Sequence, residues 1–420
     1  MLTRAENQML TQVGPGTPMG ELLRECWTPA LRSAGLEADG APARVRLLGE
    51  NFVAFRAADG RVGFFDEGCP HRCTSLALAR NEDNALTCIF HGWKIDVSGK
   101  VVEVPSEPPE RRAEFAAKVR VRHYPVREAG GLIWVYLGKR EQPPQFYNFE
   151  FHQGPASAIV RRAVVHGNWL QGFEGQLDSA HLGMLHSSAI AANPFAIDNR
   201  TGPMSRANTA PSFEFVMQPY GFREAALRHL PDGTVYARIR EVVLPYFSFI
   251  PGDQGKSRLV VAVVPIDDEW SAHWYYYMNP YGPVPQDYRD WSFWGTTDND
   301  DNYSQDMGSR DNMWHQDRRA MKEGHWSGIM RNFTYEDFIV EESMGPIADR
   351  SREYLGSSDT VIIRTRRMLL KALRDHREHG ALPFGLDRRI DYSRVRALAI
   401  RFSAAQNWLE INPLDPPPAL

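Results

Sequence analysis

Two short boxes of cysteine and histidine could together bind a metal centre. The first is Cys-Pro-His-Arg at 69–72, and the second is Cys-Ile-Phe-His-Gly-Trp at 88–93. Each box offers one thiolate and one imidazole. A set of two cysteines and two histidines suits either a structural zinc ion or an iron–sulfur cluster with mixed ligands. The spacing therefore predicts a closed metal site whose ligands are Cys69, His71, Cys88 and His91.

The residues beside these ligands separate the two kinds of site. Arg72 follows the first histidine, and Gly92-Trp93 follows the second. In both respects the boxes resemble the Rieske domains of aromatic-ring oxygenases, in which two cysteines bind one iron of a [2Fe–2S] cluster and two histidines bind the other. Neutral imidazoles raise the reduction potential of such a cluster, so it passes single electrons. We therefore favour the cluster over zinc, and another part of the chain must use the electrons.

A second group of candidate ligands includes His181 and His186. Two histidines and one carboxylate form the metal site of mononuclear non-haem iron enzymes, which leaves positions open for O₂ and substrate. On a regular helix these two histidines would point about 140° apart. Gly183 lies between them and could permit a local irregularity. The carboxylate must come from elsewhere, and the candidates are Glu336, Asp337, Glu341, Glu342 and Asp349.

Together the two sites resemble the α subunit of a Rieske non-haem iron oxygenase, specifically of the phthalate dioxygenase family. The resemblance covers nearly the whole chain and rests on the metal boxes and the segments 168–187, 316–318 and 342–350. It implies that Asp337 completes the iron site, with Asp349 as the alternative. Glu341 and Glu342 are expected to satisfy neighbouring polar groups instead, and the position of Asp349 beside Arg350 suggests an ion pair.

The resemblance also gives Asp178 a role in electron transfer. A ligating histidine commonly donates its second N–H to a carboxylate. Asp178 would therefore connect His181 at the iron with a histidine of a Rieske cluster. The resemblance implies that this cluster belongs to a neighbouring chain, because the family assembles as a head-to-tail ring of three. Such contacts close into a ring when the rotation allows it, so we expect a homotrimer or a dimer of trimers.

The expected activity is that of a terminal oxygenase. The sequence has no G-x-G-x-x-G fingerprint after a strand, so electrons from NAD(P)H must arrive through a separate reductase, by resemblance a flavin and iron–sulfur protein. The expected reaction is dihydroxylation of a phthalate-like aromatic carboxylate by O₂. The alternatives are O- or N-demethylation or aryl-ether cleavage and, in another class, electron transfer without oxygenation. A pure electron carrier would have no use for the second site.

A carboxylated substrate needs cationic or hydroxyl donors in a mainly apolar pocket. Arg238 and Arg240 alternate along a predicted strand, so both could project from one face of it. The candidate substrate contacts are Ser179, Arg206, Arg238 and Arg240.

Composition narrows the partners and the compartment. The chain has 48 Lys and Arg residues against 52 Asp and Glu residues, which argues against nucleic acid as the main partner. No apolar run approaches the roughly 20 residues of a membrane span, and the first residues lack the apolar region of a signal peptide. Only four cysteines are present. With two assigned to the cluster, a disulfide framework is excluded and a cytoplasmic location fits best. Cys73 could be a ligand or a redox thiol, but we favour a small residue packed in the cluster loop.

The elements that must position these residues form two folded regions of an α+β protein. Alternating apolar residues from Val45 onwards predict an all-β domain that carries the metal boxes on loops. Strands followed by helices predict a catalytic domain with an antiparallel sheet and covering helices, by resemblance a helix-grip, START-like fold. We expect a helical segment at 1–44 that packs on the catalytic domain, a Rieske domain at 45–145 and the catalytic domain at 146–420. Its predicted elements are a mostly helical stretch at 168–186, strands at 159–165, 213–217, 225–230, 235–243, 258–264 and 272–277, and a long helix at 360–379.

Overall fold

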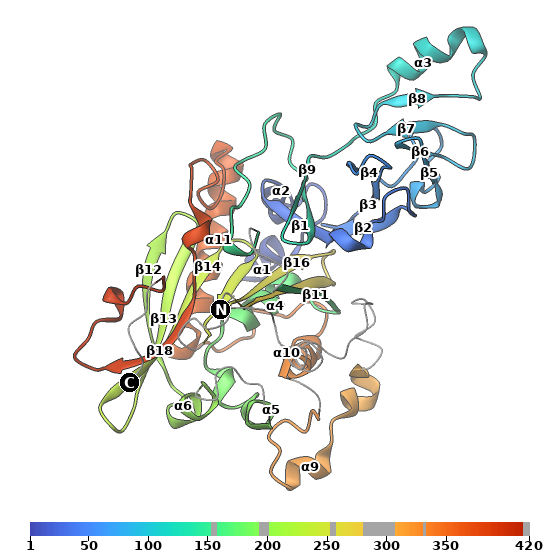
Figure 1. The fold of residues 1–420 in the computed structure, drawn as a ribbon. Helices are drawn as coiled ribbons and strands as arrows, with labels where there is room; N and C mark the ends of the chain where they lie inside the picture. Colours follow the sequence, from blue (N-terminus) through green and yellow to red (C-terminus); the bar gives the residue numbers. More distant parts are fainter. Residues whose placement is uncertain (153–157, 193–200, 253–257, 280–306, 331–332, 415–420) are drawn as a thin grey trace. The chain divides into compact units, whose positions relative to one another are not determined.

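The computed structural model describes residues 1–152, 158–192, 201–252, 258–279, 307–330 and 333–414. The chain divides into two compact units, and Figure 1 shows the elements of each. The smaller unit is Val13–Tyr147, and the larger unit joins Met1–Gln12 to Asn148–Leu420. In the described ranges no helix is long and apolar enough to cross a membrane.

Three small antiparallel sheets form most of the smaller unit (Figure 1). The first contains β2 (Ala43–Leu47), β3 (Glu50–Arg56) and β4 (Val62–Asp66). The second contains β5 (Arg80–Glu82), β6 (Ala85–Thr87), β7 (Lys94–Asp96) and β8 (Val101–Glu103). The third contains β1 (Trp27–Arg32), β10 (Leu132–Tyr136) and β9 (Val126–Ala129). The helices of this unit are α2 (Pro18–Arg24) and α3 (Arg112–Lys118).

The third sheet corrects the predicted role of the first 44 residues. β1 pairs antiparallel with β10, and Trp27 lies opposite Tyr136. Strand pairing commits both partners to one sheet, so residues 13–44 belong with the smaller unit. Only Met1–Gln12, which includes α1 (Arg4–Thr11), belongs with the larger unit.

An eight-stranded antiparallel sheet organises the larger unit. Its strand order is β11-β17-β16-β15-β14-β13-β12, and β18 pairs with β14 outside this path. The strands are β11 (Ala158–Val165), β12 (Ser212–Gln218), β13 (Gly221–His229), β14 (Thr234–Val243), β15 (Phe247–Ile250), β16 (Arg258–Pro265), β17 (Ser271–Met278) and β18 (Leu398–Ser403). The predicted strands of the catalytic domain are therefore present, together with β15 and β18, which the sequence patterns did not reveal.

The described part of the larger unit also contains helices. They are α4 (Trp169–Leu177), α5 (Ser187–Ala192), α6 (Thr201–Ala207), α9 (Arg318–Lys322), α10 (Phe333–Ser343) and α11 (Thr360–His379). Figure 1 shows α9 lying away from the sheet. α4 packs on β15, β16 and β17, and it also contacts α1, α10 and α11. These observations confirm the α+β class and the long helix at 360–379. The predicted helical stretch at 168–186 is too long, because α4 ends at Leu177.

Candidate metal centres

The two metal boxes adopt the same backbone turn. In the first, the Cys69 N–H donates to Thr74 O at 2.8 Å and the Cys73 N–H donates to Cys69 O at 2.9 Å. In the second, the Cys88 N–H donates to Trp93 O at 2.8 Å and the Gly92 N–H donates to Cys88 O at 2.9 Å. Each box is thus the same turn with its cysteine at the first position, while the histidine is the third residue of the first turn and the fourth residue of the second.

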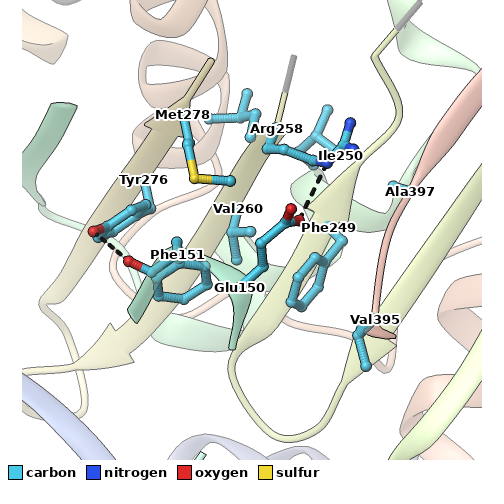
Figure 2. A pocket seen from close by; sticks show the side chains of 11 residues that line it. Glu150, Phe151, Phe249, Ile250, Arg258, Val260, Tyr276, Met278, Val395 and Ala397 are labelled. Atoms are coloured by element: carbon cyan, nitrogen blue, oxygen red, sulfur yellow. Dashed lines mark hydrogen bonds and ion pairs between the residues drawn. The ribbon is translucent and has the colours of Figure 1, made fainter. Parts of the chain in front are cut away.

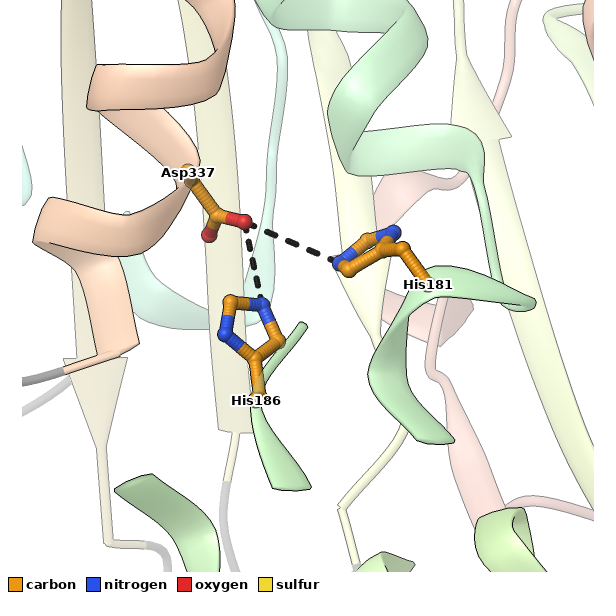
Figure 3. Close-up of side chains that lie close together, drawn as sticks. All are labelled: His181, His186 and Asp337. Carbon is orange, nitrogen blue, oxygen red and sulfur yellow. Dashed lines mark ion pairs between the residues drawn. The ribbon is translucent and has the colours of Figure 1, made fainter. Parts of the chain in front are cut away.

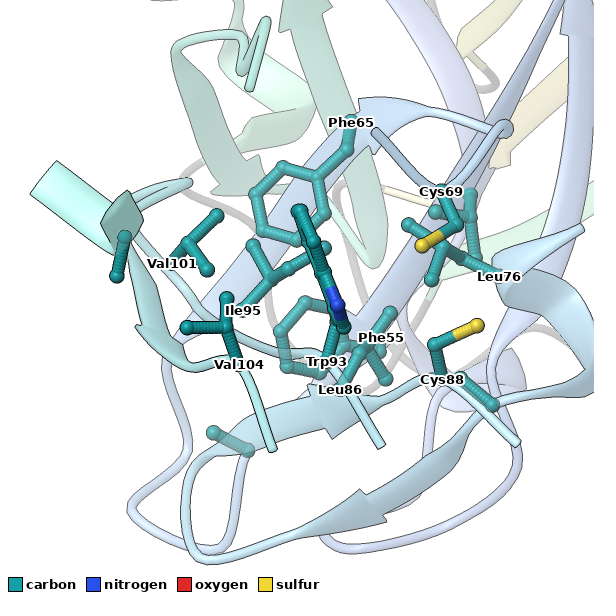
Figure 4. Close-up of a cluster of buried hydrophobic side chains, with 14 residues drawn as sticks. Phe55, Phe65, Cys69, Leu76, Leu86, Cys88, Trp93, Ile95, Val101 and Val104 are labelled. Carbon is teal, nitrogen blue, oxygen red and sulfur yellow. The ribbon is translucent and has the colours of Figure 1, made fainter. Parts of the chain in front are cut away.

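The four predicted cluster residues lie in these turns. Cys69 and Cys88 are buried in the core of the smaller unit, and Figure 4 shows both thiols at the edge of its apolar side chains. The Cys88 thiol is near enough to the Cys69 thiol to affect its pKa. The rings of His71 and His91 are 4.5 Å apart between centroids, and His71 stacks on Trp93 at 4.6 Å. Two adjacent thiols and two adjacent imidazoles fit a mixed-ligand iron–sulfur cluster.

Burial, with a smaller contribution from the neighbouring Cys88, raises the pKa of the Cys69 thiol to about 11, although hydrogen bonds from the backbone of His71 and Arg72 oppose this rise. The protein alone therefore does not stabilise a thiolate here. A bound cation would supply the missing positive charge, since metal ligation requires the deprotonated form.

Cys73 is exposed, so the interpretation that it packs inside the cluster loop is wrong. It adopts φ 58°, while Gly92 adopts φ 71° at the matching position of the second turn. The turn requires a left-handed residue at this position, which glycine adopts readily and cysteine adopts with strain.

The second group of predicted ligands converges in the larger unit. His181, His186 and Asp337 each offer one ligand atom, and these atoms lie within 4.8 Å of one another (Figure 3). The Asp337 Oδ1 lies 3.0 Å from His186 Nε2 and 3.7 Å from His181 Nε2. Two imidazoles and one carboxylate in this arrangement fit a mononuclear metal ion with positions left open.

A second carboxylate orients each histidine of this triad. His186 Nδ1 lies 2.8 Å from Glu336 Oε2, and His181 Nδ1 lies 3.4 Å from Asp178 Oδ2. Ser327 Oγ in turn donates to Glu336 Oε1 at 2.5 Å. Both rings therefore turn Nε2 towards Asp337 and keep Nδ1 for a supporting carboxylate, as in many protein metal sites. The sequence presented Glu336 only as a candidate ligand and gave no sign of this supporting contact.

The close packing of the triad and its supporting carboxylates shifts the pKa values of His186 and Asp337. Burial lowers the pKa of His186, but Asp337 and Glu336 outweigh it and raise the pKa to about 9. Burial raises the pKa of Asp337, while the charges of His186 and His181 and a hydrogen bond from His186 lower it overall. The protein thus holds a proton on His186 at neutral pH, and a metal ion could displace that proton and take its place.

The other acidic candidates lie in different surroundings. Asp349 is exposed and accepts hydrogen bonds from Ser351, so its expected ion pair with Arg350 is not formed. Glu342 accepts from the His166 N–H and from Trp314 Nε1.

Glu341 differs from the expectation that it satisfies neighbouring polar groups. It is buried, and neither carboxyl oxygen has a hydrogen-bond partner in the part of the chain that the structure describes. His273 Nε2 lies 3.6 Å away. Burial raises the pKa of its carboxyl well above the usual value.

The backbone around Asp178 explains how two histidines five positions apart converge. α4 ends at Leu177, and Asp178 has extended dihedrals of φ −73° and ψ 125°. His181 then lies in a 3₁₀ turn that ends at Gly183. A Cβ at Gly183 would lie 2.7 Å from Ser205 O, so glycine serves here for close packing rather than for an unusual φ.

A buried cationic cluster lies on the sheet face next to this segment. It consists of Arg228 on β13 and Arg238 and Arg240 on β14, which are at most 4% exposed. Arg240 donates to Leu177 O and to Ser179 Oγ, and Arg228 donates to Ser179 O at 2.6 Å.

Glu224 is the nearest acid of this cluster, with an oxygen 3.4 Å from Arg240. Burial raises the pKa of Glu224, and Asp178 adds to this, although the arginines lower it. The cluster therefore carries more positive than negative charge. Arg228 was not among the residues selected from the sequence.

The remaining predicted substrate contact is placed differently. Arg206 on α6 is exposed, and its guanidinium donates to Ser187 O at 3.0 Å.

Figure 2 shows an apolar niche between β15, β16 and β17, in which Glu150 pairs with Arg258. Its cavity volume is about 10 Å³, which is room for about one water molecule and not for an aromatic ring.

Two family models match the regions that contain the two candidate sites. The Rieske [2Fe-2S] domain family matches residues 26–125, and the family described as LigXa C-terminal domain like matches residues 135–413. This chain belongs to the Rieske non-haem iron oxygenase family. The Rieske domain binds a [2Fe–2S] cluster, and the second match covers the whole triad.

Related proteins are oxygenase subunits. The chain is 36% identical over 423 residues to the 3-chlorobenzoate-3,4-dioxygenase oxygenase subunit of Comamonas testosteroni, covering 94% of each chain. It is 39% identical to the phthalate 4,5-dioxygenase oxygenase subunit of Pseudomonas putida, covering 89% of this chain and 86% of the relative. A further relative, the 5,5'-dehydrodivanillate O-demethylase oxygenase subunit of a Sphingobium strain, is 32% identical over 88% of this chain and 80% of its own.

Solved structures share the fold of this Rieske oxygenase. The QL mutant of Pseudomonas putida CBB5 NdmA with caffeine aligns with a TM-score of 0.63 at 18% identity, covering 89% of this chain and 100% of that one. The terminal oxygenase of carbazole 1,9a-dioxygenase from Novosphingobium sp. KA1 aligns with a TM-score of 0.58 at 19% identity, covering 88% and 95%.

Proposed function

We propose that this Rieske oxygenase dihydroxylates a small aromatic carboxylate. The buried cluster of Arg228, Arg238 and Arg240 carries this proposal. Among the described residues, three buried guanidinium groups have two acids near them, Glu224 and Asp178, so one positive charge is left over. Isolated buried charge is costly. A substrate carboxylate would balance the excess. The names of two relatives, a chlorobenzoate and a phthalate dioxygenase, agree with such a substrate.

Arg238 is the arginine best placed to receive the carboxylate. Each of the three arginines has one guanidinium nitrogen without a hydrogen-bond partner among the described residues. Arg228 and Arg240 already bind Ser179, whereas Arg238 does not and is the most exposed of the three, at 4%. Arg240 already donates a hydrogen bond to Ser179 Oγ. Arg240 and Ser179 would therefore orient the substrate from the side of Asp178. Arg206 remains a second candidate, on α6. A bidentate contact between guanidinium and carboxylate would fix the ring in one orientation.

We assign the metal-binding roles as follows. His181, His186 and Asp337 hold a mononuclear Fe(II), and Cys69, His71, Cys88 and His91 hold the cluster. When bound, the cluster supplies single electrons and the iron supplies O₂ activation. Glu336 and Asp178 fix the imidazoles through Nδ1. The reaction adds both atoms of O₂ to the ring and consumes two electrons and two protons, and the electrons come from NAD(P)H through a flavin and iron–sulfur reductase.

Turnover under ¹⁸O₂ with a reductase and a panel of benzoates tests the reaction. Two labelled atoms in one cis-dihydrodiol are expected, and formaldehyde release would instead identify a demethylase, as the name of the Sphingobium relative suggests. Arg238→Gln should raise KM for the carboxylate but not for the corresponding amide. Arg206→Gln compares the second candidate, and Arg401→Gln, whose partner is the exposed Asp232, is the matched control. An unchanged KM in Arg238→Gln would refute the role of Arg238.

We further propose that the working unit is a homotrimer, alone or stacked as a dimer of trimers. The two metal sites lie in separate compact units, which are each some tens of ångströms across for their length. Asp178, whose side chain is 25% exposed, would reach a cluster histidine of a neighbouring copy.

The free cysteines agree with a reducing, cytoplasmic location.

Mixing inactive Asp337→Ala and His71→Ala chains tests transfer between copies. Hybrid trimers should regain activity, because an intact cluster then faces an intact iron site. Mixed trimers with intact metals but no activity, or an active stable monomer, would contradict the ring.

A further inference from the structure

We propose that the N-terminal helix α1 positions the metal-bearing segment of the larger unit, although it supplies none of the three ligands. This inference rests on the proposed mononuclear iron site. It concerns residues 1–12, which are separated from His181 by the whole of the smaller unit in the sequence but fold with the larger unit.

The end of α1 is joined to the start of α4. The last carbonyls of a helix have no partner within the helix. Here Trp169 Nε1 donates to Leu10 O at 3.1 Å, and Asn168 Nδ2 donates to Thr11 O at 2.9 Å. The other atom of the same amide, Asn168 Oδ1, accepts from the Leu170 N–H and caps α4. One buried side chain therefore caps both helices.

The middle of α1 is joined to the loop that follows α10. Asn7 Nδ2 donates to Ala348 O at 3.0 Å, and Asn7 Oδ1 accepts from Arg350 Nη1 at 3.2 Å. Arg350 is fully buried and also pairs with Glu174 of α4 at 3.0 Å. Asn7 thus contacts both the backbone of this loop and the arginine that connects it with α4.

Gln171 closes the network between α4 and α10. Its Nε2 donates to Glu341 O at 3.1 Å and to Gly345 O at 3.0 Å, and its Oε1 accepts from the Ala348 N–H at 2.7 Å. α4 leads directly into Asp178 and His181, and α10 carries Asp337. The polar network that includes α1 therefore fixes both elements that bring the triad together.

Loss of these contacts would act on the site through geometry. Without Asn7, the Ala348 carbonyl and Arg350 Nη1 would each lose their shorter partner and keep only the 3.4 Å hydrogen bond to each other. Poorly satisfied polar groups at a partly buried position are costly, so the loop would shift to improve its hydrogen bonds. A metal site tolerates displacements of only about 0.5 Å. The consequence would be weaker metal binding at the triad.

The test compares Co(II) binding to the mononuclear site in chains that retain the Rieske cluster. Asn7→Ala should weaken binding about three- to tenfold, as expected for the loss of two hydrogen bonds. Asn7→Asp keeps the acceptor for Arg350 and should recover part of the affinity. Gln8→Ala, on the exposed side of the same helix, should bind like the wild type. The cluster absorption and the thermal midpoint serve as controls.

The outcomes separate the inference from the proposed function. If the wild type shows no Co(II) absorption that depends on Asp337, the iron site itself is wrong. If the wild type binds Co(II) and Asn7→Ala binds equally well, only the role of α1 is refuted. A lowered thermal midpoint with unchanged affinity would likewise refute positioning and leave a purely structural helix. If Asn7→Ala does not fold, Asn7→Asp alone carries the test, with a loss of about twofold expected and unchanged affinity counting against the proposal.

Discussion

Glu336→Ala should weaken metal binding at the triad although Glu336 is not one of the ligands. Its Oε2 lies 2.8 Å from His186 Nδ1, and the two side chains are 0% and 2% exposed. Removal would leave a buried N–H without an acceptor and free the ring to rotate. Loss of such a supporting carboxylate typically costs 10- to 100-fold in metal affinity, or about 1.4–2.7 kcal/mol.

A second effect opposes this loss. Glu336 helps to raise the pKa of His186 to about 9, so its removal lowers that pKa and weakens the competition between proton and metal. We therefore expect a net loss near the lower end of the range, about tenfold at pH 7. Glu336→Gln keeps an acceptor without the charge and should lose less.

Anaerobic titration of the metal-depleted mononuclear site with Fe(II) measures this loss, and the Rieske absorption reports the folded fraction. Glu342→Gln is the matched control on the same helix, because its carboxylate contacts Trp314 and the His166 N–H instead of the triad. Equal Fe(II) affinity in Glu336→Ala and Glu342→Gln would refute the reasoning.

Three further predictions concern stability and are measured by chemical unfolding. Gly172→Ala should lower the free energy of unfolding by about 1–2 kcal/mol, because its Cβ would lie 2.5 Å from the buried His273 ring. Gly35→Ala is the control and should leave the stability unchanged, because its Cβ meets nothing within 4 Å. Equal losses of stability in the two variants would contradict this prediction. Cys73→Gly should stabilise by about 0.5–1 kcal/mol, because φ 58° suits glycine, and a loss of stability would show that the thiol itself matters. Burial lowers the pKa of His273 from 6.5 to about 3 in the folded protein. Between these two pH values only the unfolded chain binds a proton at His273, so the stability of the fold falls as the pH drops towards 3. In His273→Gln, the loss of stability between neutral pH and pH 5 should be about 2 kcal/mol smaller than in the wild type. The same dependence of stability on pH in both proteins would count against this prediction.

The candidate ligands could be selected from the sequence because their residue types and local spacing carry the signal. Cys69, His71, Cys88 and His91 lie in two short turns, and His181 and His186 lie in one segment. The histidines converge for a reason that periodicity could not reveal, because α4 ends at Leu177 instead of continuing.

The contacts that support the ligands could not be predicted from local sequence patterns, because they join segments that are far apart in the chain. Glu336 meets His186 across 150 positions, and Asn7 meets Arg350 across 343. Residues 13–44 were misassigned for the same reason, since β1 pairs with β10 about 100 positions later. Long-range pairing depends on the whole fold, and a local pattern does not encode it.

Metal analysis of wild-type, Asp337→Ala and Asp349→Ala protein tests the central claim most directly. With a two-iron cluster and one mononuclear site, the wild type and Asp349→Ala should each contain about three irons per chain. Asp337→Ala should contain about two, with an unchanged Rieske paramagnetic signal and no oxygenation. Zinc in place of iron, or loss of the third iron from Asp349→Ala but not from Asp337→Ala, would contradict the account.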